Sequence, residues 1–204
     1  MRRGIWTAVT VVGVAMLCAA VGLALFNLRT DMAAAQSRDS VLQALLATMP
    51  EESDDAVSGT VNPDDVESDA AQPSEMATID IDGNAYIGTI FFPTLNLELP
   101  VLAVYDLPSL RIAPAVYYGT PAGGDLVICA HNYYSHFGRL NQLAAEDEVL
   151  LKTVDDVTYH YQVSTTEIVS PNAVADVTSG EWDLTLFTCT LSGQTRVVVR
   201  CDLT

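Results

Sequence analysis

The chain has 204 residues, enough for one membrane segment, a linker and one domain of roughly 120 residues with its own core. Its formal net charge at pH 7 is −17, from 26 acidic and 9 basic residues. No basic patch is available to follow a phosphate backbone, so nucleic acid is not expected as a partner. The four cysteines show no C-x-x-C spacing, and neither a metal site nor a cofactor is indicated.

An apolar segment, residues 5–26, follows Arg2 and Arg3. As a helix, its roughly 22 residues can span a hydrocarbon core of about 30 Å. It is longer than the apolar core of a cleavable signal peptide, although the small residues 33–35 leave cleavage as an alternative. Residues 1–30 are therefore predicted to be a cytoplasmic tip and a transmembrane anchor. The two arginines favour a cytoplasmic N-terminus, which would place the rest of this single-pass protein outside the cytoplasm.

The next segment, residues 31–80, is predicted to combine a juxtamembrane helix with a linker. Apolar residues at helical spacing between Val41 and Met49 indicate a short helix, which Pro50 would end. Residues 51–77 carry only acidic charges and few large apolar side chains. Such a composition cannot offset chain entropy by burial, so we expect an extended, disordered tether.

Residues 81–204 are predicted to form an all-β domain. Short β-branched runs bounded by Gly, Pro, Asn or Ser indicate strands at residues 86–92, 97–104, 125–130, 157–169, 184–188 and 195–202. Residues 107–112 and 137–145 between them are predicted to be short helices. Many short strands with little helix are typical of a β-barrel or a β-sandwich.

Side chains with useful chemistry stand at the ends of predicted strands. Cys189 ends one apolar run and His131 follows another, while Arg196 and Arg200 share one face of a third. A thiolate can attack a carbonyl, an imidazole can protonate a leaving amine, and a guanidinium can stabilise developing negative charge. Composition alone, however, favours Cys189 as a small buried hydrophobe and the arginines as a solvated edge.

These segments together resemble the sortase family. The resemblance lies in an Ala-His-Asn segment at 130–132, the Thr-Leu-Phe-Thr-Cys strand at 185–189 and the following Arg196. Residues 86–93, 97–101 and 136–140 also resemble the family, so the similarity covers about residues 84–203. It implies an eight-stranded β-barrel with one or two short helices and a Cys-His-Arg site in a groove.

The resemblance also implies roles for individual residues. Cys189 would be the nucleophile, His131 the general acid/base and Arg196 the stabiliser of the oxyanion or substrate backbone, with Arg200 as the rival for that last role. Asn132, His136, Thr188 and Arg200 are expected at the substrate-binding surface. Cys129, which precedes His131 on the same strand face, is expected either to fill space beneath the histidine or to lie near the site. A Cys129–Cys201 disulfide is left open.

The implied reaction is cleavage of a C-terminal sorting signal of the L-P-x-T-G type through a thioacyl link to Cys189. An amine of a cell-wall precursor or of another protein would then take the acyl group, at the surface of a Gram-positive type envelope. The short connection between Cys189 and Arg196 resembles a class B or related small sortase. The alternative is a catalytically idle, membrane-tethered β-barrel that only binds peptides.

Overall fold

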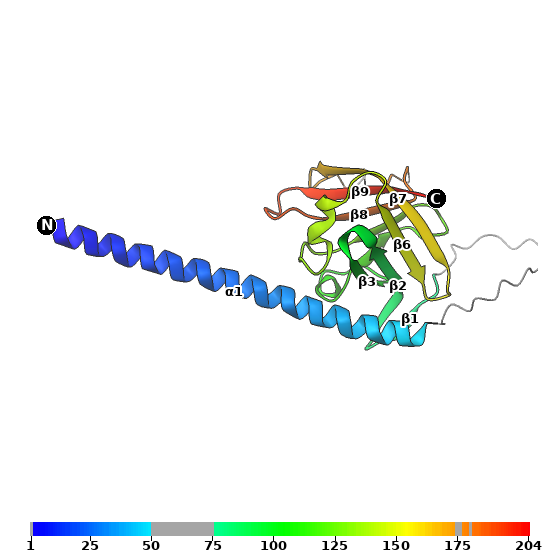
Figure 1. Ribbon diagram of the computed structural model, residues 1–204, viewed down its shortest axis with the longest axis horizontal. Helices are drawn as coiled ribbons and strands as arrows, with labels where there is room; N and C mark the ends of the chain where they lie inside the picture. Colours follow the sequence, from blue (N-terminus) through cyan, green and yellow to red (C-terminus); the bar gives the residue numbers. More distant parts are fainter. Residues whose placement is uncertain (1, 50–75, 174–176, 180) are drawn as a thin grey trace, which may run out of the picture.

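A long helix and a β-barrel beside its C-terminal half make up the described protein (Figure 1). The computed structural model describes residues 2–49, 76–173, 177–179 and 181–204. Helix α1 (Arg2–Thr48) is continuous across the predicted anchor and the predicted juxtamembrane helix. The predicted acidic tether lies outside the described residues except at its C-terminal end.

The described part of the chain contains nine strands, of which eight close into a barrel. Their bounds are β1 (Ile79–Ile81), β2 (Asn84–Phe92), β3 (Leu97–Leu102), β4 (Ala115–Tyr118), β5 (Leu126–Cys129), β6 (Glu148–Thr153), β7 (Thr158–Val169), β8 (Leu184–Cys189) and β9 (Arg196–Leu203). The order around the barrel is β2-β3-β4-β5-β8-β9-β7-β6, and β6 pairs with β2 to complete the ring. Strand β1 pairs with β2 outside this ring. The predicted eight-stranded barrel is confirmed.

Among the described residues, three short 3₁₀ helices lie in the connections, namely η1 (Pro93–Leu95), η2 (Ser109–Arg111) and η3 (Phe137–Gln142). The second and third correspond to the two short helices that the sequence predicts. Strands β1, β4 and β6 lie outside the predicted runs.

The barrel interior is filled by apolar side chains from all of its walls, including Ile90, Leu99, Ile128, Leu151 and Leu186, each with no exposed surface. Such close-packed interiors hold strand ends in fixed positions, which a catalytic site requires.

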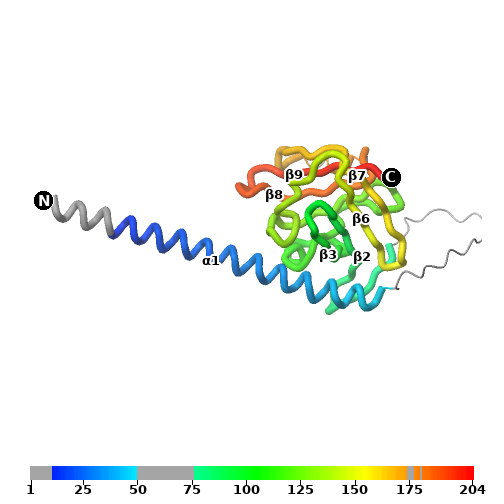
Figure 2. Tube along the Cα trace, viewed as in Figure 1, coloured from blue at the N-terminus to red at the C-terminus, as the bar shows by residue number. Residues whose placement is uncertain are grey.

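A second apolar cluster joins α1 to the outside of the barrel. Val41, Leu45 and Met49 of the helix pack with Tyr86 of β2 and Leu102 of β3. The chain trace shows the helix passing along one side of the barrel, while residues 11–29, all exposed, project beyond it (Figure 2). Because the helix buries one face here, the barrel and α1 form one packed unit.

Candidate active site

Strand pairing brings three distant positions to one end of the barrel. Strands β5 and β8 run parallel, with Cys129 paired to Phe187. His131 and Cys189 each lie two residues further on, so both leave the sheet on the same side. Strands β8 and β9 are antiparallel, with Cys189 directly opposite Arg196. The topology therefore gathers a thiol, an imidazole and a guanidinium.

A cavity of about 230 Å³ opens where these three side chains meet. Cys189, His131 and Arg196 all line it, together with Thr188 and mostly apolar neighbours. Three of these neighbours form an aromatic wall (Tyr105, Tyr117 and Phe187). Their rings meet edge to face, with centroids 5.2 Å apart for Tyr105–Tyr117 and 5.3 Å for Tyr117–Phe187. The cavity thus offers an apolar surface beside its reactive groups.

Hydrogen bonds tie the segments around Cys189 and His131 together. The Thr188 hydroxyl donates to the Ala130 carbonyl oxygen at 2.9 Å. The Asn132 side-chain amide donates to the Thr190 carbonyl oxygen at 3.2 Å. The first bond joins the residues just before Cys189 and His131, and the second joins the residues just after them. The Thr188 and Asn132 side chains therefore hold the two strand ends in register.

The His131 ring is half-buried and tilts against Tyr133, with ring centroids 5.0 Å apart. Burial lowers the pKa of His131, and the nearby positive charge of Arg111 lowers it further. Both effects disfavour the protonated ring. A neutral imidazole at physiological pH is able to accept a proton from a thiol.

The Arg196 guanidinium folds onto the loop between β8 and β9. Its Nη1 donates to the carbonyl oxygens of Gly193 at 3.2 Å and of Thr195 at 3.1 Å. Among the described residues, its Nε and Nη2 groups have no hydrogen-bond acceptor. These donors remain for a substrate carbonyl or an oxyanion in the cavity.

Two residues expected at the substrate surface, Arg200 and His136, are buried away from the cavity. Arg200 is only 4% exposed, and it donates from Nε to Glu167 at 3.1 Å and from Nη1 to the Thr185 hydroxyl at 3.3 Å. These bonds hold its guanidinium within the β7–β8–β9 surface. Arg200 does not line the cavity.

His136 is fully buried and does not line the cavity either. Its ring lies 5.5 Å from the Tyr133 ring, and both ring nitrogens lack a hydrogen-bond partner in the described structure. Burial lowers the pKa of His136 to about 4, and the charges of His131 and Arg38 act in the same direction. Asp31 and the Ala34 carbonyl of α1 act in the opposite direction. His136 therefore belongs to the contact between α1 and the loop that begins at His131.

Cys129 lines the same cavity but is only 2% exposed. Burial raises its pKa to about 12, so it stays a thiol at physiological pH. Cys201 is also buried, with a raised pKa from the same cause. Both are free thiols, so the disulfide that the sequence left open is not formed. Of the four cysteines, the half-buried Cys189 is the one at the meeting point of the catalytic candidates.

The aromatic wall is the part of the site that the sequence did not indicate. Its members come from the β3–η2 connection, from β4 and from β8, and no shared motif connects them. The only sequence signal is the placement of an aromatic residue at or near a strand end.

Comparison with known proteins gives one family model and a set of solved structures. Residues 90–204, more than half of the chain, match the family model described as Sortase domain. Sortase C from Clostridium perfringens SM101 is 25% identical with a TM-score of 0.52, over 58% of this chain and 70% of that one. A search of the curated proteins found no match.

Two further structures are similar. Sortase A from Corynebacterium diphtheriae is 24% identical with a TM-score of 0.54, over 59% of this chain and 61% of that one. The Clostridium perfringens sortase C solved with the C-terminal cell wall sorting motif is 24% identical with a TM-score of 0.53, over 58% of this chain and 70% of that one.

Proposed function

Because the chain belongs to the sortase family, whose members are cysteine transpeptidases that act on sorting signals, we propose that Cys189, His131 and Arg196 carry out its reaction. The observation that supports this assignment most is that the three side chains, from three different strand ends, line one cavity. Thr188 and Asn132 act as positioning residues, because their bonds hold the strand ends that carry the cysteine and the histidine.

In the first half-reaction, neutral His131 takes the proton of the Cys189 thiol, and the resulting thiolate attacks the carbonyl carbon of the scissile peptide bond. The carbonyl oxygen becomes an oxyanion, which the free donors of Arg196 stabilise. As the C–N bond breaks, protonated His131 gives its proton to the leaving nitrogen. A thioester on Cys189 and a neutral His131 remain.

In the second half-reaction, the nitrogen of an amine acceptor attacks the thioester carbonyl. His131 takes a proton from that nitrogen, the C–S bond breaks and a new amide leaves the cavity. The proton on His131 then returns to the Cys189 sulfur, which restores the thiol and the neutral imidazole, so the cycle closes. The aromatic wall limits the water that can reach the thioester, which favours transfer over hydrolysis.

The substrate is a secreted protein with an L-P-x-T-G-like C-terminal sorting signal, and the acceptor is an amine of a cell-wall precursor or of another protein. The aromatic wall supports the first part, because it can bury the apolar residues of such a motif. The relative solved with the C-terminal cell wall sorting motif supports the same substrate class. Assignment to class B or a related small sortase stays a prediction, as do the domain boundaries.

Helix α1 anchors the protein in the cell membrane, with the N-terminus in the cytoplasm and the barrel outside. The candidate span within Val11–Thr48 has a mean hydropathy of 2.3 and no burial against protein. An uncovered apolar helix of this length is expected in lipid rather than in water.

Mass spectrometry of the intact protein after incubation with sorting-motif peptides tests the assignment. The wild-type chain should gain the mass of the acyl fragment on Cys189, and Cys189→Ala should gain none while keeping its fold by circular dichroism. His131→Ala should lower the rate of adduct formation. Unchanged cleavage by Cys189→Ala would show that another group is the nucleophile.

A further inference from the structure

The free part of α1 ends where the barrel begins. All of residues 11–29 are exposed, whereas the barrel covers one face of the helix from Thr30 onward. Phe26 and Leu28 are the last large apolar residues of the exposed part, at 65% and 55% exposure. From Phe26 to Asp31 the helix rises only about 7 Å. If α1 spans a bilayer, the barrel therefore lies directly on the bilayer surface.

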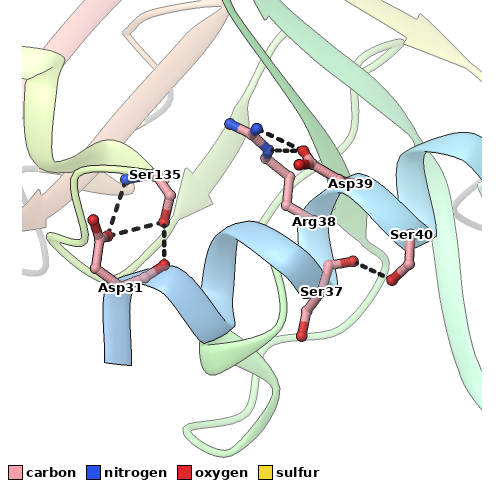
Figure 3. A network of polar contacts seen from close by, with 6 residues as sticks. All are labelled: Asp31, Ser37, Arg38, Asp39, Ser40 and Ser135. Atoms are coloured by element: carbon pink, nitrogen blue, oxygen red, sulfur yellow. Dashed lines mark hydrogen bonds and ion pairs between the residues drawn. The ribbon is translucent and has the colours of Figure 1, made fainter. Parts of the chain in front are cut away.

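Contacts of Asp31 determine which side of the barrel lies next to the end of the exposed helical segment. Its carboxylate oxygen Oδ1 accepts from the Ser135 backbone nitrogen at 3.1 Å and from the Ser135 hydroxyl at 3.0 Å (Figure 3). The Ser135 hydroxyl also lies 3.4 Å from the Asp31 carbonyl oxygen. Ser135 belongs to the loop between β5 and η3 that begins at His131. The loop that begins at His131 is thus bound to α1 just after the end of the apolar segment of the helix.

Two exposed apolar side chains stand on the same side. Leu191 is 96% exposed and Tyr134 is 66% exposed. Both border a hollow of about 750 Å³ whose other side is formed by Phe26, Leu28 and their neighbours on α1. The β8–β9 loop, which carries Leu191, extends from the barrel toward the N-terminal half of α1 (Figure 1). In a bilayer, Phe26 and Leu28 would contact lipid headgroups and upper acyl chains, and these loops would contact the same region.

The charge of these loops differs from that of the whole chain. Residues 131–139 and 190–196 contain Arg139 and Arg196 but no aspartate or glutamate, in a chain with 26 acidic residues. The Arg139 guanidinium lies 4.9 Å from the centre of the Tyr134 ring. Tyrosine beside arginine, without carboxylates, is a composition favoured at the membrane–water interface.

We propose that the loops at residues 132–134 and 190–195 form a bilayer-contacting surface, with Leu191 and Tyr134 in the headgroup region of the leaflet from which α1 emerges. The partner is the lipid surface itself. This inference rests on the proposed anchoring by α1, but not on which side of the membrane the barrel occupies. Because His131, Cys189 and Arg196 adjoin these loops, the active-site cavity would lie close to the bilayer surface.

Tryptophan fluorescence of the full chain in phosphatidylcholine nanodiscs tests the surface. Leu191→Trp is made in a chain that also carries Trp6→Phe and Trp182→Phe. The matched control is Val157→Trp in the same background, because Val157 is an exposed apolar residue (42%) in the β6–β7 turn at the opposite end of the barrel. Some nanodiscs contain lipids brominated near the headgroup. We expect quenching and a blue shift at residue 191, and neither at residue 157.

A third protein keeps Trp6 as its single tryptophan and reports on anchoring. One outcome separates the two proposals: Trp6 is quenched by brominated lipid, Cys189 still forms its acyl adduct, and residue 191 behaves like residue 157. That outcome would refute the lipid-contacting surface and leave the proposed function standing. If residue 191 responds only to added sorting-motif peptide, the loop binds substrate and the proposal is likewise overturned. Unquenched Trp6 would overturn both the anchor and the surface.

Discussion

Arg196 and Arg200 share one face of β9 but have different surroundings. Arg196 stands at the strand end where the cavity opens, and its two bonds go to carbonyl oxygens of its own loop. Arg200 lies deeper in the sheet, where Glu167 and Thr185 take up its donors. Alternation along a strand sets the face of a side chain but not its depth, so alternation alone could not separate the two arginines, and the preference for Arg196 came from the family resemblance.

Truncation of Arg196 should therefore lower activity, whereas truncation of Arg200 should lower stability. Arg196→Ala should lower kcat/KM for peptide cleavage by about 10²- to 10³-fold, because a donor to the oxyanion is lost, without lowering the melting temperature. Arg200→Ala should lower the free energy of unfolding by about 1–3 kcal/mol and leave kcat/KM nearly unchanged. Peptide cleavage and denaturant unfolding of both variants provide the measurement. The reverse pattern would exchange their assignments.

His131 should give the acid limb of the pH profile of kcat/KM. Because burial and Arg111 lower its pKa, the limb should fall below the ordinary value of 6.5. Arg111→Gln removes the repelling charge and should move the limb upward. Lys152→Gln, which removes a positive charge from β6 and its ion pair with Asp156, serves as the matched control and should leave the limb in place. A limb unaffected by Arg111→Gln would mean that another group titrates.

At the scale of the elements, most of the strands that the sequence predicted have a β-like local composition. Strands β2, β5, β7, β8 and β9 are rich in β-branched or aromatic residues, and their predicted bounds differ from the observed ones by only a few residues. Strand β4 was not predicted, because it has only four residues between Pro114 and Gly119. Strand β6, Glu-Val-Leu-Leu-Lys-Thr, consists largely of helix-forming residues, and pairing with β2 and β7 decides its conformation.

The same limit applies to the candidate site. Strand ends and a family resemblance pointed to Cys189, His131 and Arg196. Their convergence, however, depends on the parallel pairing of β5 with β8, which is non-local and leaves no spacing signal. The burial of His136 depends on the docking of α1, which the sequence did not predict. What those three residues do chemically stays a prediction until variants are measured.

The loop from His131 to Phe137 should make stability depend on pH through His136. Its folded pKa of about 4 lies below the ordinary 6.5, so the unfolded chain takes up the proton first as the pH falls. The free energy of unfolding should therefore be unaffected by His136 above pH 6.5 and should fall between pH 6.5 and pH 4, by at most about 3 kcal/mol. Asp31, Arg38, His131 and Tyr133 are the titratable groups that face it.

Denaturant unfolding of the wild type and of His136→Phe over this pH range measures the effect. His136→Phe keeps an aromatic ring without a titrating nitrogen, so its unfolding free energy should fall less between pH 6.5 and pH 4 than that of the wild type. Equal losses in the two proteins would show that His136 is not the titrating group.

At the scale of the whole molecule, α1 is an outer layer that docks through a narrow apolar stripe. Leu45 has no exposed surface, whereas its neighbour Leu46 is 49% exposed. Leu45→Ala should weaken the α1–barrel contact by about 2–5 kcal/mol, and Leu46→Ala should have little effect. Hydrogen exchange should speed up in residues 31–48 of the first variant while the barrel amides stay protected. Equal exchange in both variants would contradict the docking.

The closure of the ring by β9 has a consequence for biogenesis. This strand pairs with both β7 and β8 and supplies Arg196, so before it arrives the ring is open beside the thiol. Because β9 follows β7 and β8 in the chain, it is the last of these three strands to be synthesised. With the N-terminus held in the cytoplasm as proposed, the chain that follows α1 crosses the membrane in sequence order, so Cys189 crosses before Arg196 comes to lie opposite it. We therefore expect a molecule whose β9 has not yet crossed the membrane to lack peptide-cleaving activity.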